Sequence, residues 1–177
     1  MSDRHRRSIR LQDYDYTQAG AYFVTTCTFQ RAHLFGTVID GTMLLNDTGV
    51  LVQHEWAQTA MLRDYVELDA FVVMPNHFHG IIVITEDLQG MRPHAPTTDP
   101  ARRQFAKPIA KSLSSIIAAF KAGVTRALKL RSGSIERPIW HRNFYEHIIR
   151  SEAELNRIRD YIEHNPARWR EDRFYLE

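Results

Sequence analysis

A pair of histidines is the feature of this sequence best suited to chemistry by residue type and spacing. His77 and His79 are two positions apart within an apolar stretch, so a strand through them would point both imidazoles to one face of a sheet. Imidazole nitrogens bind borderline divalent metals, and Phe78 would face the core in phase with Ile82 and Ile84. Polar residues inside an apolar run destabilise the fold unless they are satisfied. The triplet therefore indicates either a metal site or an ordinary hydrogen-bonded pair.

Tyr161 and Asn165 offer a reacting group and a further ligand. They are four positions apart in a predicted helix, so they lie near the same face, about 6 Å apart along the axis. A tyrosine oxygen can attack phosphorus, and an amide can help to hold a metal ion. His164 is a competing ligand. The structural alternative makes Tyr161 an edge-of-core aromatic residue and Asn165 a residue at the helix end before Pro166.

Cations gather in three segments, although the formal net charge of the chain is only +2. Clustered cations of this kind can follow a phosphate backbone. A mixture of aromatic and basic residues over 140–147, WHRNFYEH, is typical of surfaces that stack single-stranded bases. The candidate contacts to nucleic acid are Arg4, Arg6, Arg7, Lys111, Ser115, Lys121, Arg142, Tyr145, Arg168 and Arg170. The alternative is a solvated basic surface with aromatic residues in the core.

Apolar periodicity and turn residues predict the elements that must position these side chains. Strands are expected over 21–29, 67–74 and 78–85, and a hairpin over 33–45 around Asp40-Gly41. Helices are expected over about 48–63, 109–130 and 151–165, the last opened by a capping box of Ser151 and Glu154. Residues 139–149 are expected to be extended. Many strands joined by short links favour an α+β domain of two layers with a largely antiparallel sheet.

The length of 177 residues favours one domain, with a basic N-terminal arm over about 1–19. A long loop is expected over about 86–107, which holds three prolines and little periodic apolar content. Cys27 is the only cysteine, which excludes an intrachain disulfide and a thiolate zinc cluster. No apolar run reaches the roughly 20 residues that span a bilayer, so we expect no membrane partner and a cytoplasmic location.

Taken together, the motifs resemble those of the HUH single-tyrosine transposases, and most of all the REP-associated tyrosine transposases. The resemblance rests on VELDAFVVMPNHFHGIIVI over 66–84 and on IWHRNFYEHIIRSEAELNRIRDYIEHNPARW over 139–169. GAYFVTTCTFQR and SLSSIIAAFK resemble the first strand and the basic helix of the same branch. The combination of MPNHFHG with a downstream YIxxNP is far more specific than either motif alone.

The resemblance implies a ferredoxin-like two-layer sandwich with a central antiparallel sheet and helices on one side. It implies that His77 and His79 bind a divalent metal, Mg²⁺ or Mn²⁺, and that Tyr161 is the nucleophile. Related insertion-sequence enzymes place a glutamine as third ligand at the position of Asn165, whereas the REP-associated branch has asparagine. The implied activity is endonuclease and strand transfer on single-stranded or hairpin DNA through a 5′-phosphotyrosine.

The implied setting is a bacterial cytoplasm, in association with the nucleoid, where short palindromes fold into hairpins. The protein is expected to act as a monomer or a homodimer. Three rival interpretations remain open at this point. The chain is a catalytically silent hairpin-binding regulator, a metal hydrolase that activates water, or a structural protein without a metal.

Overall fold

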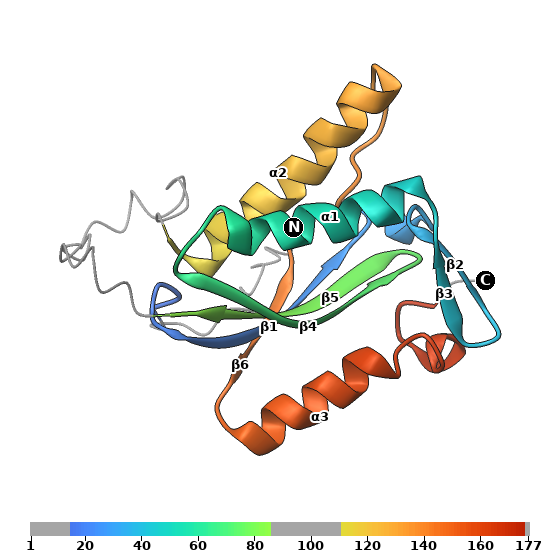
Figure 1. Cartoon of the computed structure of the whole chain (residues 1–177). Coiled ribbons are helices and arrows are strands. Elements are labelled where there is room, and N and C mark those ends of the chain that lie inside the picture. The colour runs from blue at the N-terminus through green and yellow to red at the C-terminus, as the bar shows by residue number, and fades with distance from the viewer. Residues whose placement is uncertain (1–14, 86–110, 176–177) are drawn as a thin grey trace, which may run out of the picture.

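Four antiparallel strands form the central sheet of the computed structural model, which describes residues 15–85 and 111–175 (Figure 1). The strand order is β4-β5-β1-β6. The bounds of these strands are Gly20–Cys27 for β1, Val66–Met74 for β4, His77–Ile84 for β5 and Tyr145–Ile149 for β6. The predicted strands and the α+β class are confirmed. The predicted loop over 86–107 and the first 14 residues of the predicted basic arm lie outside the described residues.

A separate two-stranded hairpin, β2 (Gly36–Ile39) and β3 (Thr42–Leu45), follows β1 in the chain. Asp40 and Gly41 connect its strands with φ angles of 49° and 74°. Positive φ at both central residues matches the twist of a tight hairpin, which is why Asp-Gly is common there. The predicted hairpin is therefore confirmed, and its tip reaches the backbone of Ala167 beyond the last helix.

Within the described residues, three α-helices cover the sheet, and they do so from both faces: α1 (Asp47–Met61), α2 (Leu113–Ser132) and α3 (Glu152–Glu163). Figure 1 shows α1 and α2 together on one face and α3 on the other. The expectation of helices on one side thus holds for α1 and α2 and is wrong for α3. The reason lies in β1, where Tyr22 and Val24 join the larger core under α1 and α2, while Phe23 packs under α3. A strand that is apolar on both faces needs cover on both.

The start of α2 departs from the periodicity of the sequence for a local reason, whereas the start of α3 keeps the expected cap. The helix expected from about residue 109 begins at Leu113, because Lys111 has a left-handed φ of 64° and Ser112 caps the helix by accepting from the Ser115 amide. At α3, Ser151 accepts a hydrogen bond from the Glu154 amide, as the capping box predicts. The Glu154 carboxylate accepts from the Arg150 amide at 2.9 Å, one residue earlier than in the standard box.

Only part of the stretch expected to be extended over 139–149 is strand. Trp140 forms an isolated bridge with Thr28, and β6 begins at Tyr145. Between them the Lys121 ammonium donates to the carbonyls of residues 141, 142 and 143, at 2.7, 3.5 and 3.3 Å. These carbonyls point toward α2 and therefore take no part in the hydrogen bonds between strands. Among the described residues, no helix is long and apolar enough to cross a membrane.

The helix that carries Tyr161 is fixed to the sheet by apolar and ionic contacts. Ile162 is 2% exposed and packs with Phe23 and Ile81, and the predicted stripe is completed by Leu155 and Ile158. The Arg159 guanidinium donates to both carboxylate oxygens of Asp69, with Nε at 2.8 Å from Oδ1. Asp69 lies where the β4–β5 register shifts, between Leu68 and Phe71. The helix therefore docks on the sheet of its own chain.

Candidate metal and tyrosine site

The two histidines open β5 and point to the face covered by α3. His77 pairs with Cys27 and Met74 across the sheet, and His79 pairs with Thr25 and Val72. Both imidazoles are completely buried. Phe78 between them lies in the larger core on the opposite face, as the alternation predicts.

Hydrogen bonds to the β4–β5 turn and to β1 orient the two rings. The Asn76 amide nitrogen donates to the Phe174 carbonyl at 2.8 Å, so its oxygen accepts from His77 Nδ1 at 2.9 Å. His79 Nδ1 lies 2.8 Å from the Thr25 hydroxyl. The Asn76 oxygen can only accept, so it fixes the tautomer of His77, while the Thr25 hydroxyl holds the orientation of the His79 ring. Each ring is left with Nε2 to offer, and His77 Nε2 is buried without a hydrogen-bond partner among the described residues.

Burial keeps these imidazoles in the form that binds a cation. It lowers the pKa of His77 from the usual 6.5 to about 4, and the Arg173 charge acts in the same direction. It also lowers the pKa of His79 well below 6.5. Both rings are therefore neutral at pH 7, with lone pairs that protons do not occupy.

Tyr161 reaches this pair from α3, across 82 residues of sequence. Its hydroxyl lies 3.3 Å from His79 Nε2 and 3.4 Å from the Oδ2 atom of Asp172. The ring meets Phe23 edge-on at 6.2 Å, and the residue is 38% exposed. Burial and the nearby Asp172 charge raise the pKa of the phenol. The tyrosine is thus placed at the histidines but needs a positive charge to ionise.

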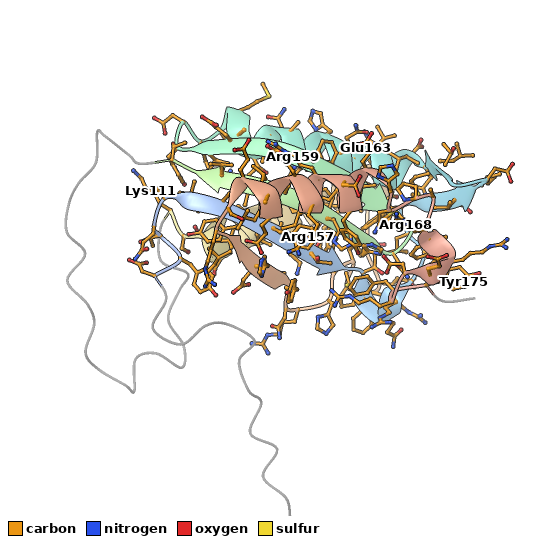
Figure 2. All side chains as sticks on the ribbon, turned by 90° about the horizontal axis from the view of Figure 1, so that it is seen from below. Lys111, Arg157, Arg159, Glu163, Arg168 and Tyr175 are labelled. Atoms are coloured by element: carbon orange, nitrogen blue, oxygen red, sulfur yellow. The ribbon has the colours of Figure 1, made fainter. Side chains whose placement is uncertain are left out.

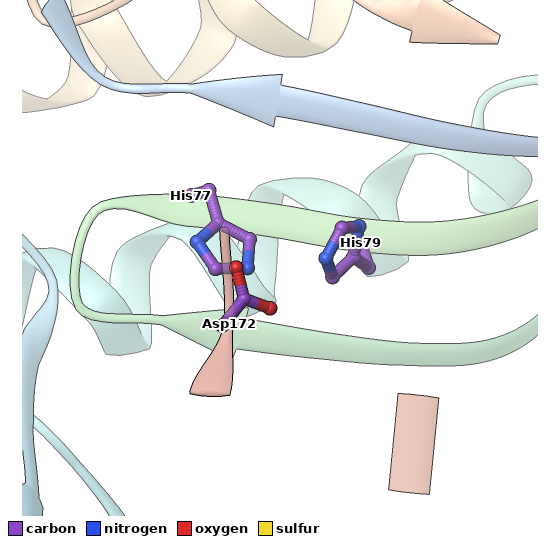
Figure 3. A group of neighbouring side chains, drawn as sticks. All are labelled: His77, His79 and Asp172. Carbon is purple, nitrogen blue, oxygen red and sulfur yellow. The ribbon is translucent and has the colours of Figure 1, made fainter. Parts of the chain in front are cut away.

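Asn165 and Asp172 complete the polar cluster. Asn165 follows the end of α3, is 2% exposed, and donates from Nδ2 to Asp172 Oδ2 at 3.2 Å. Its Oδ1 atom is buried and has no hydrogen-bond partner in the described parts of the chain. His77, His79 and Asp172 offer ligand atoms that all lie within 4.8 Å of one another (Figure 3). This cluster can hold a metal ion, and the two unpartnered buried atoms fit such an ion.

Asp172 is the member of the cluster that sequence reasoning missed. It comes from the C-terminal segment 169–175, which has no regular spacing to the histidines. The flanking aromatic residues Trp169 and Phe174 were the available signal, since both are buried against the His77 ring, at centroid distances of 5.8 and 4.6 Å. His164, the competing ligand, bonds Asp160 on the exposed side of α3 and is not part of the cluster.

Comparison with known proteins places this chain in a family. No family model matches the chain. An uncharacterized protein of Haemophilus influenzae is 41% identical over 173 residues, which cover 98% of this chain and 94% of that protein, and the two belong to one family. A second protein of that organism, provisionally named a REP-associated tyrosine transposase, is 25% identical over 87% of this chain and 74% of its own length. The chain is a relative of the REP-associated tyrosine transposases.

A solved structure shows the same fold. It is that of a REP-associated tyrosine transposase bound to a REP hairpin, with a TM-score of 0.59 and 23% identity. The match covers 90% of this chain and 74% of the solved one. The match confirms the expected α+β fold, and the resemblance inferred from the sequence motifs is supported by the 25% identical relative.

The residues predicted to contact nucleic acid are not gathered at this site. Figure 2 places Lys111 at the end of the molecule opposite Arg168. Ser115 takes part in the cap of α2 through its hydroxyl, which donates to the Ser112 carbonyl at 2.7 Å. Burial lowers the pKa of Lys121 to about 8, and its ammonium is engaged by carbonyls. Arg4, Arg6 and Arg7 lie outside the described residues.

The remaining candidates are surface residues, two of which lie near the cluster in sequence. Arg142 is exposed in the segment held by Lys121, and Tyr145 is half-buried under the Arg173 guanidinium at 5.6 Å. Arg168 and Arg170 are exposed between Asn165 and Asp172.

Two cations beside the cluster were not among the candidates. Arg31 and Arg173 lie over the Phe174 ring at 5.3 and 4.6 Å, and Arg31 donates to the Arg173 carbonyl at 3.1 Å. Both are exposed, and neither is paired with a carboxylate of residues 15–85 or 111–175. Both are close enough to His77 to lower its pKa.

Proposed function

We propose that the chain is a metal-dependent endonuclease and strand transferase for single-stranded hairpin DNA, which acts through a 5′-phosphotyrosine. The observation that carries the proposal is the hydroxyl of Tyr161 at 3.3 Å from His79 Nε2, within the cluster of buried metal-binding groups. The relationship to REP-associated tyrosine transposases supports the DNA substrate, since one such protein was solved bound to a REP hairpin.

His77, His79 and Asn165 are the proposed ligands of Mg²⁺ or Mn²⁺. When bound there, such an ion draws negative charge from a non-bridging oxygen of the scissile phosphate. The protein residues set the geometry, because Asn76 and Thr25 hold the two rings by Nδ1, which leaves Nε2 of each ring to bind the ion and that of His79 facing Tyr161.

Tyr161 is the proposed nucleophile. Its oxygen forms a bond to phosphorus in line as the bond from phosphorus to the 3′ oxygen breaks. The proton lost by the phenol is regained by the departing 3′ hydroxyl, so the exchange of ester bonds is balanced. The bond energy stays in the phosphotyrosine, and a second 3′ hydroxyl can reverse the reaction and join a new strand without ATP.

The phosphates on either side of the reacting one need cations. We assign this contact to Arg31 and Arg173, which flank the site without a carboxylate partner among the described residues. The exposed Arg142, Arg168 and Arg170 and the N-terminal arginines are the proposed contacts to the rest of the hairpin, and Tyr145 a platform for a base.

A 3′-labelled hairpin oligonucleotide with a single-stranded foot tests the chemistry, because the fragment attached to the tyrosine then carries the label. With Mn²⁺ we expect a labelled protein band that survives denaturation. Tyr161→Phe should remove this band and keep DNA binding, since the ring contact with Phe23 remains. Tyr65→Phe, which removes a phenolic hydroxyl outside the cluster, is the matched control.

Each rival interpretation predicts a different product. A hydrolase that uses water releases a free 5′-phosphate and leaves no labelled protein. A catalytically silent regulator binds the hairpin and leaves it intact in Mn²⁺. If the labelled protein band persists in Tyr161→Phe, the proposed activity stands, but Tyr161 is not the nucleophile.

A further inference from the structure

We infer that Asp172 is a ligand of the ion proposed at His77 and His79, and that this bond ties the C-terminal segment 169–175 to the site. The inference rests on the proposed metal site and adds a ligand from an element outside both motifs. Figure 3 shows the Asp172 carboxylate facing the edges of the two imidazoles.

The distances suit a shared ion after small movements. Ligand atoms about 2.1 Å from an Mg²⁺ or Mn²⁺ ion are at most about 4.2 Å apart, when they lie opposite each other. The ligand atoms of His77, His79 and Asp172 already lie within 4.8 Å of one another. Movements of a few tenths of an ångström by each side chain would therefore close a coordination shell.

The charge of the site also calls for a carboxylate. His77, His79 and Asn165 are neutral donors, and two of the three donors are nitrogen. Hard cations such as Mg²⁺ and Mn²⁺ favour oxygen ligands and carboxylates in particular. Without a carboxylate ligand, the positive charge of the ion would be uncompensated in a buried site that has the Arg31 and Arg173 cations close by. Among the described residues, Asp172 is the carboxylate whose oxygen joins the histidine cluster.

Hydrogen bonds already orient the Asp172 carboxylate toward the cluster. Its Oδ1 accepts from the Phe174 amide at 2.7 Å, and its Oδ2 accepts from Asn165 Nδ2 at 3.2 Å. Outer contacts of this kind hold ligands in place in metal sites. Asn165 would then act twice, with its amide nitrogen on the Asp172 ligand and its unpartnered oxygen available to the ion.

The segment that supplies Asp172 is held by a few further contacts. The Phe174 carbonyl accepts from Asn76, and the Arg173 carbonyl accepts from Arg31. The Phe174 ring packs on His77 at 4.6 Å. A metal bond to Asp172 joins this set, so metal binding should protect the peptide bonds around residues 169–175 from proteolysis and amide exchange.

The inference is tested by measuring Mn²⁺ binding to the full chain without DNA. Titration calorimetry and the electron paramagnetic resonance signal of free Mn²⁺ both report this binding. We expect Asp172→Asn to weaken Mn²⁺ binding by at least 10-fold, while Asp160→Asn, at an exposed carboxylate of α3, leaves it unchanged. Asp172→Asn keeps the shape of the side chain and an oxygen for the Phe174 amide, and a matching melting profile would verify its fold. Mn²⁺ should also slow amide exchange over 169–175 in the wild type and not in Asp172→Asn.

The outcomes separate this inference from the proposed function. If Mn²⁺ binds and His77→Gln abolishes binding, the proposed histidine site stands. Unchanged or tighter Mn²⁺ binding by Asp172→Asn would then overturn the inference, and a rise in DNA adduct in the same variant would show that the carboxylate occupies the place of the substrate phosphate. If the wild type binds no Mn²⁺ at the histidines, the proposed metal site fails and the Asp172 ligand fails with it.

Discussion

Acid should destabilise the metal-free protein through His77, and the size of the effect can be worked out from its burial. Burial lowers the pKa of His77 to about 4 in the folded protein, against 6.5 for an exposed imidazole. The unfolded chain therefore binds a proton at a higher pH than the folded one. The stability that follows is fully present above pH 6.5 and is lost as the pH falls through about 4.

The expected loss is large for one side chain. With about 1.36 kcal/mol for each pH unit between the two pKa values, His77 alone contributes about 3 kcal/mol between pH 7 and pH 4. Urea unfolding in EDTA, followed by tryptophan fluorescence at pH 7, 5.5 and 4, measures the free energy of unfolding directly. Carboxylates titrate in the same pH range. The contribution of His77 is therefore isolated by comparing the pH dependence of the free energy of unfolding between the wild type and His77→Gln.

His77→Gln should have a shallower dependence on pH than the wild type, by about 3 kcal/mol over this range. His141→Gln, at an exposed position, is the control for the loss of an imidazole at the surface. Parallel pH profiles for the wild type and His77→Gln would refute the reasoning, because they would mean that the folded protein accommodates a proton on His77 as easily as the unfolded chain does.

Three further outcomes are expected, one from a variant of the site and two from variants of the fold that supports it. Thr25→Val removes the partner of His79 Nδ1 and should weaken Mn²⁺ binding by about 10- to 100-fold in calorimetry, with little change in the melting temperature; equal affinity would mean that the hydroxyl does not orient the ring. Arg159→Met breaks the pair with Asp69, both partners of which are partly exposed, and should lower the free energy of unfolding only slightly, because water screens such a pair. Because Arg159 lowers the pKa of Asp69, that difference should vanish as the pH falls through the Asp69 pKa, and a difference that persists there would contradict an ionic origin. Gly49→Ala places a methyl group against the Phe35 backbone carbonyl and should destabilise by about 1–3 kcal/mol in urea unfolding, whereas Gly123→Ala meets only the movable end of Glu55 and should be neutral or stabilising; the opposite order would contradict the close approach of Gly49 to that carbonyl.

Much of the fold follows from short-range patterns in the sequence. The alternation through Phe78 and Ile82 identifies the strand and places both histidines on one face. Asp40-Gly41 identifies its hairpin because few other residue pairs take two positive φ angles easily. The Ser151 and Glu154 pair identifies the start of α3, where the amide and side-chain bonds are local.

Features that depend on contacts between residues far apart in the sequence cannot be predicted from local patterns. The apolar stripe of α3 indicates that the helix packs against another element. Only the three-dimensional course of β6 decides which face of the sheet it covers. A lysine on a basic helix suggests a phosphate contact, yet Lys121 folds back onto three carbonyls about 20 residues later in the chain. Asp172 meets the histidines because the segment after α3 turns back over them, and no periodicity encodes such a turn.

The opposed directions of His77, Phe78 and His79 also bear on how a protein of this kind can evolve. An insertion or deletion of one codon just before the triplet would shift it by one place against β1 and β4, which pair with it on both sides. Phe78 would then occupy the reactive face, and the imidazoles would meet the aromatic core around Trp56. The chemistry and the core would fail in the same event. Lineages can therefore exchange residues around the triplet, but a change of length at that point removes the fold and the activity together.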